Sequence, residues 1–570
     1  SYLMQLLFLL FARFTRAVRN AWRRLVRRRI DWVRLSVSGA LPEIADAPSW
    51  WQRRFAGASV PLSLLGLRRR LQRLADDPQV HGVLLTITDL SAGWATIEGL
   101  HEALRSFRAG GKAVVAYLPA ADTRAYLAAC GADAIVMPPT AFLNLTGVRV
   151  EATFLGDALR LAGLDAEVIA VSPYKSGGAS LARGAITPEA REQLERLVER
   201  RFAAVVESVA AARGLTPEAV RELIDRAPLL ATAAEAAGLL DGALYEDELD
   251  AFLARRSGLE PSALKLVNWR RADRALPLPP IRRERRYVGV VRVEGAIAGG
   301  PSRRSPLPLP LIGGSQAGSD TIIQALRQAE RDRRVAAVVL HIDSPGGDAF
   351  ASDLIWREAL RLNRAKPLVV SMGDTAASGG YYIAAPARAI VARPSTLTGS
   401  IGVYTVRPNA ARLLERAEVG VATIARGANS GLYSAARPLD EGERAALRRT
   451  VFEIYESFKA RVREGRRLSD EQLEPVAGGR VWTGAEAQAL GLVDDLGGFP
   501  GAVARARALA ELPPDPRAPI LLLRGGGRIP APPRPFPVEP APAPAGALPA
   551  LLEEALRPRV LAALPWLVRE

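Results

Sequence analysis

The sequence predicts an α/β protein built from two tandem copies of one domain, preceded by a membrane-associated helix. Motifs of the second half recur in the first at a constant spacing of 255 residues, as YYIAA at 381–385 and YLAA at 126–129 do. Strands alternate with helices in both copies, which is typical of parallel α/β units. At 570 residues the chain also exceeds the size at which a single core stops growing. A duplication accounts for all three observations.

Each copy is expected to open with a short strand that a glycine closes, followed by a buried strand and a helix. Nearly continuous, β-branched apolar runs indicate strands that are covered on both faces. In the first and then the second copy, the expected segments are 33–38 and 288–293 for the opening strand, 83–87 and 338–342 for the buried strand, and 96–109 and 351–362 for the helix.

Composition divides the chain into six regions. Prolines and arginines without apolar periodicity mark a joint between the copies, and a proline-rich stretch around the apolar run 520–523 marks a second break. The last segment has helical spacing interrupted by Pro558 and Pro565, so we expect a helical tail that binds a surface or packs on the core. The regions are an amphipathic or anchor helix at 1–30, the first domain at 31–268, a linker at 269–286, the second domain at 287–511, a proline-rich linker at 512–545 and the tail at 546–570.

The charge of the chain does not indicate a nucleic-acid-binding protein. The formal net charge is +16, but the first thirty residues alone hold eight arginines and no acidic residue. The remainder lacks the interleaved aromatic and basic residues that bind bases. Cys130 is the only cysteine, so neither an intrachain disulfide nor a thiolate metal cluster can form. We expect no nucleic-acid partner and no metal or other cofactor.

The N-terminal segment is expected to lie on a membrane. Residues 2–11 are strongly apolar, but ten residues are half of the roughly twenty that a spanning helix needs. Continued through Phe14, Val18, Trp22 and Leu25 with arginines between them, the segment predicts a basic amphipathic helix in the membrane interface. Two alternatives stay open: a helix packed on the protein itself, and an anchor ahead of the numbered chain.

Three glycine-containing motifs of the second copy each follow an expected strand. They lie at 343–347 (DSPGG), 376–380 (AASGG) and 398–402 (TGSIG). Ligand crevices form at such strand ends in open parallel sheets, so the three motifs predict one site. Each motif alone is also compatible with a tight turn between a strand and a helix.

Ser378 is the candidate nucleophile of this site. It stands where a helix is expected to begin, beside backbone N–H groups that have no partner within the helix and that favour negative charge on a bound oxygen. Gly379 and Gly347 would let a substrate carbonyl approach backbone donors without a Cβ in the way. The arrangement predicts an oxyanion hole.

Lys175 is the candidate base. Serine nucleophiles need a base, and arginine cannot serve because its pKa is above about 12. None of the three histidines lies in a motif; they are His81, His101 and His341. Of the five lysines only Lys175 lies in a Tyr-Lys-Ser-Gly-Gly turn after an apolar strand, where loss of water would lower its pKa. The others have surface or charged helical contexts: Lys112, Lys265, Lys366 and Lys459.

The repeat divides this pair between the copies. At the position that matches Ser378 the first copy has Thr123, without the Gly-Gly pair that follows the serine. At 255 residues after Lys175 the second copy has Ser430, with no lysine nearby. The first copy has kept only the base and the second only the nucleophile, so we expect the active site where the halves meet.

Five motifs in this order resemble the signal peptide peptidase A family in its long, duplicated form, over residues 31–510. They are PYKSGGASLARGAITPEAREQL at 173–194, DSPGG at 343–347, MGDTAASGGYYIA at 372–384, PSTLTGSIGV at 394–403 and RVWTGAEAQALGLVD at 480–494. The resemblance implies a ClpP/crotonase-like fold in each copy and a serine protease with a Ser/Lys dyad. By motif, Ser378 is the nucleophile, Lys175 the base and Ser400 the hydroxyl that orients the lysine amine. Gly379 and Gly347 supply the oxyanion N–H groups, with Gly346 as an alternative to Gly347.

The function expected from these residues is an endopeptidase that degrades cleaved signal peptides and similar apolar, extended segments through an acyl-enzyme. The resemblance further implies a homo-oligomer, expected as a tetramer, at the inner membrane with its active site on the periplasmic side. Arginines after the apolar segment would instead stay cytoplasmic by the positive-inside tendency. A crotonase-like acyl-CoA enzyme and an inactive membrane scaffold are the alternatives. Asp343 and Asp348 depart from the neutral residues often found beside the Ser-Pro-Gly-Gly core.

Overall fold

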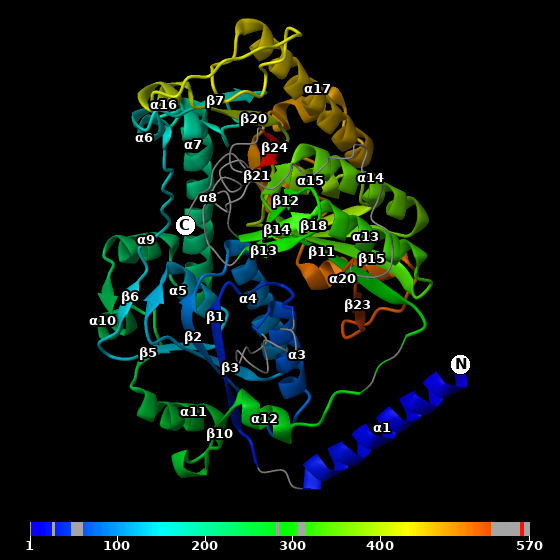
Figure 1. Cartoon of the computed structure of the whole chain (residues 1–570). Helices are drawn as coiled ribbons and strands as arrows, with labels where there is room; N and C mark the ends of the chain where they lie inside the picture. The colour runs from blue at the N-terminus through cyan, green and yellow to red at the C-terminus, as the bar shows by residue number, and fades with distance from the viewer. Residues whose placement is uncertain are drawn as a thin grey trace. The chain divides into compact units, whose positions relative to one another are not determined.

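The computed structural model describes residues 2–25, 29–46, 61–280, 282, 284–305, 314–525 and 559–563 (Figure 1). The chain divides into two compact units, the first made of Ser1–Val148 and Glu199–Arg283 and the second of Arg149–Val198 and Glu284–Glu570. These units differ from the two sequence repeats, because residues 149–198 of the first repeat pack as part of the second unit.

The first unit is built on a six-stranded parallel sheet with the strand order β10-β1-β2-β3-β5-β9. Side chains with oxygen acceptors begin two of its helices: Ser63 caps α3 and Asp122 caps α5. The strands are β1 (Trp32–Gly39), β2 (Gly82–Leu90), β3 (Ala113–Tyr117), β5 (Ala134–Met137), β9 (Gly242–Ala243) and β10 (Leu266–Asn268). The helices include α3 (Leu64–Ala75), α4 (Trp94–Ala109), α5 (Thr123–Ala129), α9 (Pro217–Asp225), α10 (Ala231–Ala236), α11 (Leu249–Ser257) and, from Glu199 onward, α8 (Pro188–Arg213). A small sheet joins β4 (Ala121–Asp122), β6 (Phe142–Asn144) and β8 (Leu229–Leu230).

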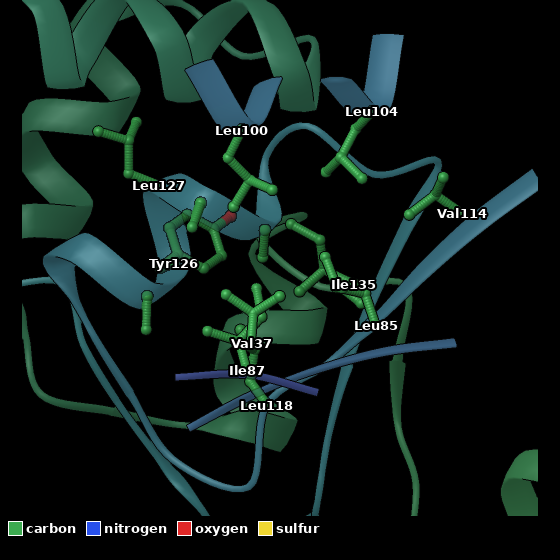
Figure 2. Packing of buried hydrophobic residues seen from close by; sticks show 14 of the residues in the cluster. Val37, Leu85, Ile87, Leu100, Leu104, Val114, Leu118, Tyr126, Leu127 and Ile135 are labelled. Carbon is green, nitrogen blue, oxygen red and sulfur yellow. The ribbon is translucent and has the colours of Figure 1, made fainter. Parts of the chain in front are cut away.

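The core of the first unit is apolar on both sides of its central strands, as continuous apolar runs require. Figure 2 shows Leu85 and Ile87 of β2 with Leu100 and Leu104 of α4 around the ring of Tyr126, all of them buried. The strand and helix predicted at 83–87 and 96–109 are confirmed as β2 and α4.

The second unit repeats this sheet, which confirms the duplication. Its parallel neighbours follow the order β23-β11-β15-β17-β18-β22, and β19 and β21 extend the sheet beyond β17. Equivalent buried tyrosines make equivalent bonds: the Tyr126 hydroxyl donates to the Leu239 carbonyl at 2.7 Å and that of Tyr381 to the Leu492 carbonyl at 2.8 Å. The strands are β11 (Tyr287–Glu294), β15 (Val335–Ser344), β17 (Leu368–Ala377), β18 (Ala389–Ala392), β19 (Leu397–Gly399), β21 (Val481–Thr483), β22 (Asp495–Leu496) and β23 (Ile520–Leu522). The helices include α13 (Ser319–Arg331), α14 (Ala349–Ala365), α15 (Gly379–Ala384), α17 (Glu441–Arg466), α18 (Asp470–Leu473), α19 (Gly484–Ala489) and α20 (Phe499–Leu509).

A second sheet of the same unit has the order β13-β14-β12-β16-β24-β20-β7 and unites distant parts of the sequence. Its strands are β7 (Asp165–Ala170), β12 (Ala296–Ala298), β13 (Arg303–Ser305), β14 (Gly314–Gly318), β16 (Gly346–Asp348), β20 (Tyr404–Asn409) and β24 (Arg559–Ala563). Short helices flank β7 and β20, namely α6 (Gly156–Leu161), α7 (Ala179–Ala182) and α16 (Ala411–Arg416). Because β7 comes from the first repeat and pairs with β20 over six residues, it ties that segment to the second unit.

Two expectations about the linkers and the tail need correction. The described part of the predicted helical tail, Arg559–Ala563, is strand β24, and the rest of 546–570 lies outside the described residues. Pro558 and Pro565 leave too short a stretch for a stable helix, whereas five residues suffice for a strand. In the linker predicted at 269–286, residues Trp269–Ala275 form helix α12, which Asn268 caps. In the linker predicted at 512–545, the apolar run forms the edge strand β23. Residues 526–545 of this linker lie outside the described residues.

The N-terminal segment forms one long helix, α1 (Tyr2–Leu25). Its polar side bonds to residues 273–279 of the same unit, where Arg16 donates to the Pro279 carbonyl at 2.7 Å and Asn20 to the Leu278 carbonyl at 3.0 Å. Among residues 11–25, whose side chains are described, the large apolar side chains are exposed; they are Phe11, Phe14, Val18, Trp22 and Leu25. Within the described part of the chain, no helix combines the length and the apolarity that crossing a membrane requires.

Candidate active site

The second unit brings three of the predicted site residues into direct contact. The amine nitrogen Nζ of Lys175 lies 2.6 Å from Oγ of Ser378, 2.9 Å from Oγ of Ser400 and 2.8 Å from the carbonyl oxygen of Ser400. All three side chains are buried, with exposed fractions of 1% for Lys175 and 0% for both serines. Lys175 of the first repeat therefore meets Ser378 and Ser400 of the second, as expected, and all three lie inside the second compact unit because residues 149–198 pack there.

Ser378 sits at a sharp turn between strand β17 and helix α15. Its backbone has φ 55° and ψ −115°, a conformation that only glycine adopts without strain. The N–H of Ser378 donates to the Gly399 carbonyl at 2.8 Å, and its own carbonyl accepts from Tyr382 at 2.8 Å in the first turn of α15. These bonds hold the hydroxyl at the carboxyl end of the strand, although the strain costs on the order of 1–3 kcal/mol.

Lys175 reaches this turn because its own segment is anchored at both sides. Strand β7 pairs with β20, and just after β7 the Val171 N–H donates to the Val403 carbonyl at 3.1 Å. The Ser172 hydroxyl then donates to the Gly478 carbonyl, and the Lys175 N–H closes a turn onto the Ser172 carbonyl at 3.2 Å. Burial away from water lowers the pKa of Lys175 well below its usual value of 10.5, because the charged ammonium is the form that loses hydration. The lowered pKa favours the neutral amine of Lys175.

Ser400 is also held in an unusual backbone conformation, with φ 53°. Its N–H donates to the Arg480 carbonyl at 2.7 Å, which fixes the turn between β19 and β20. Both oxygens of Ser400 then face the Lys175 amine, at 2.8 Å and 2.9 Å. Two acceptors on one residue orient the amine toward Ser378.

The glycines predicted as oxyanion donors differ in their hydrogen bonds. The N–H of Gly346 donates to the Ser344 hydroxyl at 3.1 Å, so this group is already engaged. Gly347 lies in β16, where a Cβ would fall 2.1 Å from the Ile297 carbonyl oxygen, so the close approach of strand β12 requires a glycine. Gly379 is the first residue of α15, and the first N–H groups of a helix have no carbonyl partner within it. The bond to Ser344 argues against Gly346 as a donor, and the place of Gly379 at the start of α15 is compatible with one.

Gly479, which was not predicted from the sequence, packs directly against Lys175. Its φ of +88° is strained for other residues, and a Cβ there would lie 2.6 Å from Cβ and 2.8 Å from Cα of Lys175. The Gly479 N–H donates to the Ile401 carbonyl at 2.8 Å, one residue from Ser400. The Gly-Gly pair at 478–479, just before the motif at 480–494, was the available signal.

We expect Gly479→Ala to lower peptide cleavage by at least about tenfold, because displacing a catalytic group by about 1 Å costs up to 100-fold. The control is Gly427→Ala in the same unit, where φ is +94° but no atom lies within 4 Å of the added Cβ. The φ strain of the two substitutions is comparable, but only Gly479→Ala adds the clash with Lys175, so both should lower the thermal unfolding temperature while only Gly479→Ala loses activity. Equal activity in the two variants would contradict this role.

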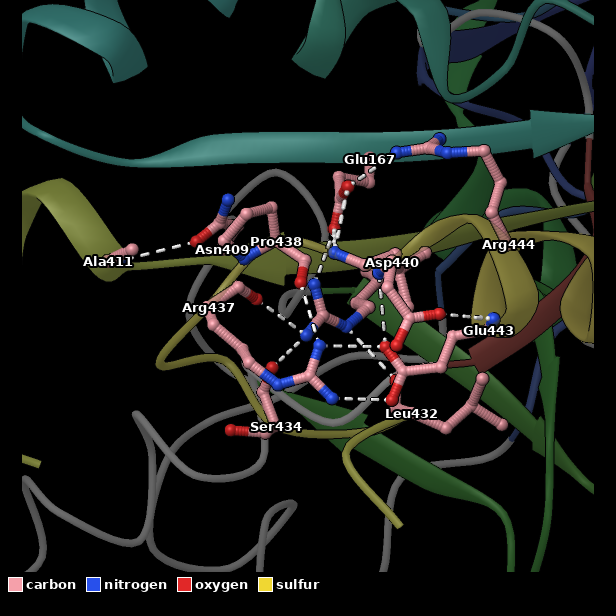
Figure 3. A network of polar contacts seen from close by, with 12 residues as sticks. Glu167, Asn409, Ala411, Leu432, Ser434, Arg437, Pro438, Asp440, Glu443 and Arg444 are labelled. Carbon is pink, nitrogen blue, oxygen red and sulfur yellow. Dashed lines mark hydrogen bonds and ion pairs between the residues drawn. The ribbon is translucent and has the colours of Figure 1, made fainter. Parts of the chain in front are cut away.

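A buried ionic network holds β7 against β20 on the far side of the lysine turn (Figure 3). Arg407 of β20, 1% exposed, pairs with Glu167 of β7. Its guanidinium also donates to three carbonyls of the loop that follows, those of Leu432, Ser434 and Arg437. Figure 3 shows Glu167 facing Arg444 as well, at 2.8 Å. The network therefore joins β7, β20 and the start of α17.

We expect Arg407→Met to destabilise the second unit by about 3–5 kcal/mol, because it leaves Glu167 without its buried partner and three carbonyls without a donor. Arg444→Met is the matched control: Arg444 pairs with the same carboxylate but is 48% exposed, so its loss should cost only about 0–1 kcal/mol. Denaturation followed by a probe in the second unit measures both. Similar losses in the two variants would contradict a structural role for the buried pair.

The remaining candidates have other partners. His341 lies in β15, where its Nδ1 is 3.3 Å from the Ser371 hydroxyl of β17. Lys112 and Lys366 occupy equivalent places in the two repeats, and each donates to two backbone carbonyls. Asp348 caps helix α14 by accepting from the Ala351 N–H at 2.7 Å. Burial first, and then the nearby charge of Asp374, raises the pKa of Asp343 to about 7.

The chain is similar to known proteins over most of its length. The model of peptidase family S49 matches the chain twice, over residues 106–260 and 361–513. The chain is 34% identical over 455 residues to "Serine protease SPPA, chloroplastic" of Arabidopsis thaliana, covering 79% of this chain and 66% of that protein. It is 30% identical over 501 residues to "Protease 4" of Haemophilus influenzae, covering 84% of this chain and 78% of that protein. "Protease 4" of Salmonella typhi is 31% identical over 472 residues, with 79% and 72% covered.

Among solved structures, the chain is similar to a ClpP1 mutant from Listeria monocytogenes. The TM-score is 0.24 at 15% sequence identity, over 38% of this chain and 94% of that one. A similarity of this size carries no statement about the fold, so the α/β assignment rests on the strand order described above.

Proposed function

This chain belongs to peptidase family S49 and is a serine peptidase of that family; we propose that Ser378 is its nucleophile and neutral Lys175 its general base. The observation that carries the proposal is the 2.6 Å contact between Lys175 Nζ and Ser378 Oγ. A base at this distance can take the hydroxyl proton as the oxygen attacks a carbonyl. Burial supports the role, because it favours the amine with a free electron pair.

The reaction follows from these positions. The Ser378 Oγ attacks the scissile carbonyl while its proton passes to Lys175 Nζ, and the N–H groups of Gly379 and Gly347 stabilise the oxyanion. Lys175 then gives the proton to the leaving amine, and the acyl-enzyme remains. Water attacks the ester with Lys175 again as base, and Ser400 keeps the amine aimed at the reacting oxygen. Each preorganised donor is expected to contribute roughly 2.7–4 kcal/mol to the transition state.

We propose extended apolar peptides, such as cleaved signal peptides, as the substrates. Strand β16 carries Gly347, and strand β20 follows the turn that holds Ser400, so the site is bordered by two strands whose facing edges pair with the extended segment β24. A peptide without its own secondary structure can satisfy its backbone groups by adding to such edges. The ClpP/crotonase-like fold of each repeat is part of this proposal.

An acyl-CoA enzyme with the same oxyanion donors is the alternative of a different class. It would need neither a covalent serine nor a lysine with lowered pKa beside it. The three contacts of Lys175 Nζ favour the peptidase.

A fluorophosphonate probe and a fluorogenic apolar peptide test the proposal on the full-length protein. We expect the probe to be found on Ser378 by peptide mass mapping and the peptide to be cleaved. An unlabelled Ser378 together with an intact peptide, at alkaline pH as well as at neutral pH, would refute the serine mechanism.

We further propose that α1 binds the protein to a membrane surface, with the peptidase on the periplasmic side of the inner membrane. The exposed side chains Phe11, Phe14, Val18 and Trp22 recur every three or four residues and so share one face of the helix, while arginines occupy the others. A homo-oligomer, expected as a tetramer, stays a prediction for measurements in solution.

We expect Phe14→Asp with Trp22→Asp to abolish binding to vesicles that contain anionic lipid, because two charges would enter the apolar contact. Tyr433→Asp is the control, since Tyr433 and Trp22 are both 66% exposed but Tyr433 lies outside α1. Vesicle sedimentation of the three proteins measures the effect. Equal sedimentation of all three would remove α1 as the contact.

A further inference from the structure

One peptide group, the one between Arg480 and Val481, links the proposed active site to helix α8. Its carbonyl, which belongs to Arg480, accepts the Ser400 N–H at 2.7 Å. Its N–H, which belongs to Val481, donates to Oε1 of Gln193 in α8 at 2.7 Å. A trans peptide group is planar, so its C=O and N–H point in opposite directions. Gln193 and Ser400 therefore bond the same rigid group from its two sides.

The orientation of this peptide group decides where Ser400 lies. Ser400 has φ 53°, a conformation that residues other than glycine keep only where surrounding bonds hold it. Its carbonyl oxygen and its Oγ face the Lys175 amine, at 2.8 Å and 2.9 Å. A continuous series of hydrogen bonds thus runs from Gln193 through the peptide group to Ser400, and from Ser400 to the proposed base.

Gln193 is buried, with an exposed fraction of 2%, and its amide can bond Val481 in one orientation only. Only the oxygen of a side-chain amide accepts an N–H, so Oε1 faces Val481 and Nε2 faces away. Within the part of the chain that the structure describes, Nε2 is buried without a hydrogen-bond partner. A buried donor without a partner costs folding free energy. The oxygen is therefore the half of this amide that the fold uses.

The same turns of α8 also hold the strand β21 and the lysine turn. Strand β21 ends the strand order on its side of the sheet, and its Val481 carbonyl accepts from Arg196, three residues after Gln193. Side chains that cover an edge strand keep it from pairing elsewhere. On the side of the base, the hydroxyl of Tyr174 donates to Glu192 at 2.8 Å. Consecutive residues of one helix, 192 and 193, thus contact both partners of the proposed dyad's surroundings, the lysine turn and β21.

Resting on the proposed peptidase function, we propose that Gln193 is a positioning residue of the active site. By holding the peptide group at 480–481 it fixes Ser400, which aims the Lys175 amine at the nucleophile. Gln193 acts through Ser400 and not on a reacting atom. Loss of its oxygen frees the peptide group to rotate, and a displacement of about 1 Å at a catalytic group costs up to 100-fold in rate.

Kinetics of Gln193→Met and Gln193→Glu in the full-length protein test this role. Methionine has a similar length but no acceptor oxygen, whereas glutamate keeps an acceptor for the Val481 N–H in either protonation state. We expect Gln193→Met to lower kcat at least about tenfold, to change KM less than about twofold, and to slow fluorophosphonate labelling by the same factor as kcat. Gln193→Glu should recover most of this loss. Arg191→Met is the matched control on the same helix and should behave as wild type, because Arg191 is 62% exposed and pairs with the exposed Glu195.

Hydrogen exchange tests the link independently of activity. The Ser400 amide should exchange at least about tenfold faster in Gln193→Met than in wild type, because the Arg480 carbonyl that accepts its hydrogen bond is no longer held in place. Arg191→Met should leave this exchange rate unchanged. Mass spectrometry of the exchanged peptides around Ser400 measures the rates.

Several results would overturn the proposal. Wild-type kcat in Gln193→Met, or an unchanged exchange rate at Ser400, would remove Gln193 as a positioning residue. A raised KM with wild-type labelling would place Gln193 in contact with substrate instead. Equal losses in Gln193→Met and Gln193→Glu would assign the effect to packing. If the wild type neither cleaves peptide nor labels, the proposed function fails, while the exchange rates still decide whether Gln193 holds Ser400.

Discussion

Ser378→Ala should lower kcat for peptide cleavage on the order of 10⁵-fold or more, the size of effect that loss of a catalytic serine has in serine proteases. The physical reason is that the oxygen proposed to form the acyl-enzyme disappears, whereas the proposed oxyanion donors and base remain. Ser378→Gly should be equally inactive but more stable than wild type by about 1 kcal/mol, because glycine relieves the strain at φ 55°. Steady-state kinetics and thermal unfolding of both variants measure the two effects.

The control for this substitution is Ser371→Ala. Ser371 is also buried, on the strand β17 that leads to Ser378, but its hydroxyl faces His341. It should keep its activity. If Ser378→Ala keeps more than about one hundredth of wild-type cleavage, the covalent mechanism is wrong, because oxyanion donors and binding alone do not sustain such a rate.

The parts of the fold that could be predicted are those encoded by local pattern and by the repeat. Continuous apolar runs predicted the strands β2 and β15. The motifs that recur in both copies predicted two sheets with the same strand order. The S49 match over residues 106–260 and 361–513 agrees with that duplication. Local pattern suffices here because a buried parallel strand is apolar whatever lies next to it.

Ser378, Lys175 and Ser400 were predicted together with their contacts, but the compact unit in which all three lie was not. Lys175 could be identified because the chain has only five lysines. No local pattern indicates, however, that residues 149–198 pack in the second unit and not with the rest of their repeat. That exchange depends on pairing between β7 and β20, which are more than 230 residues apart. Gly479 and β24 were missed for the same reason, since each is defined by a partner far away in the sequence.

Lys175→Met should reduce cleavage by about 10²–10⁴-fold, the usual contribution of a general base, and should raise stability at neutral pH. The stability gain follows from linkage. Burial lowers the folded-state pKa of Lys175 while the unfolded chain keeps the ordinary value, so between these two pKa values the unfolded state binds more protons. In that pH range folding must release a proton from Lys175, and the free-energy cost of this release grows as pH falls. Methionine fills a similar volume without that cost.

For the wild type, the lowered pKa of Lys175 predicts that kcat/KM rises as pH passes through that pKa. It also predicts that the free energy of unfolding rises with pH from the lowered pKa up to the ordinary lysine pKa of about 10.4. Both dependences should vanish in Lys175→Met. Asp343 titrates nearby, since burial and then Asp374 raise its pKa to about 7, but a raised carboxyl pKa has the opposite effect on stability. Its contribution is present at low pH and is lost as pH rises through about 7.

Asp343→Asn separates the two groups, because it removes the carboxyl titration and leaves the Thr375 N–H with an amide oxygen to bond in place of Oδ1. We expect the rising limb of kcat/KM to persist in Asp343→Asn and the fall of stability near neutral pH to disappear. A rising limb that vanishes in Asp343→Asn but remains in the residual activity of Lys175→Met would assign the titration to Asp343. In that case the 2.6 Å contact with Ser378 would be a structural hydrogen bond, and the base would have to be sought elsewhere.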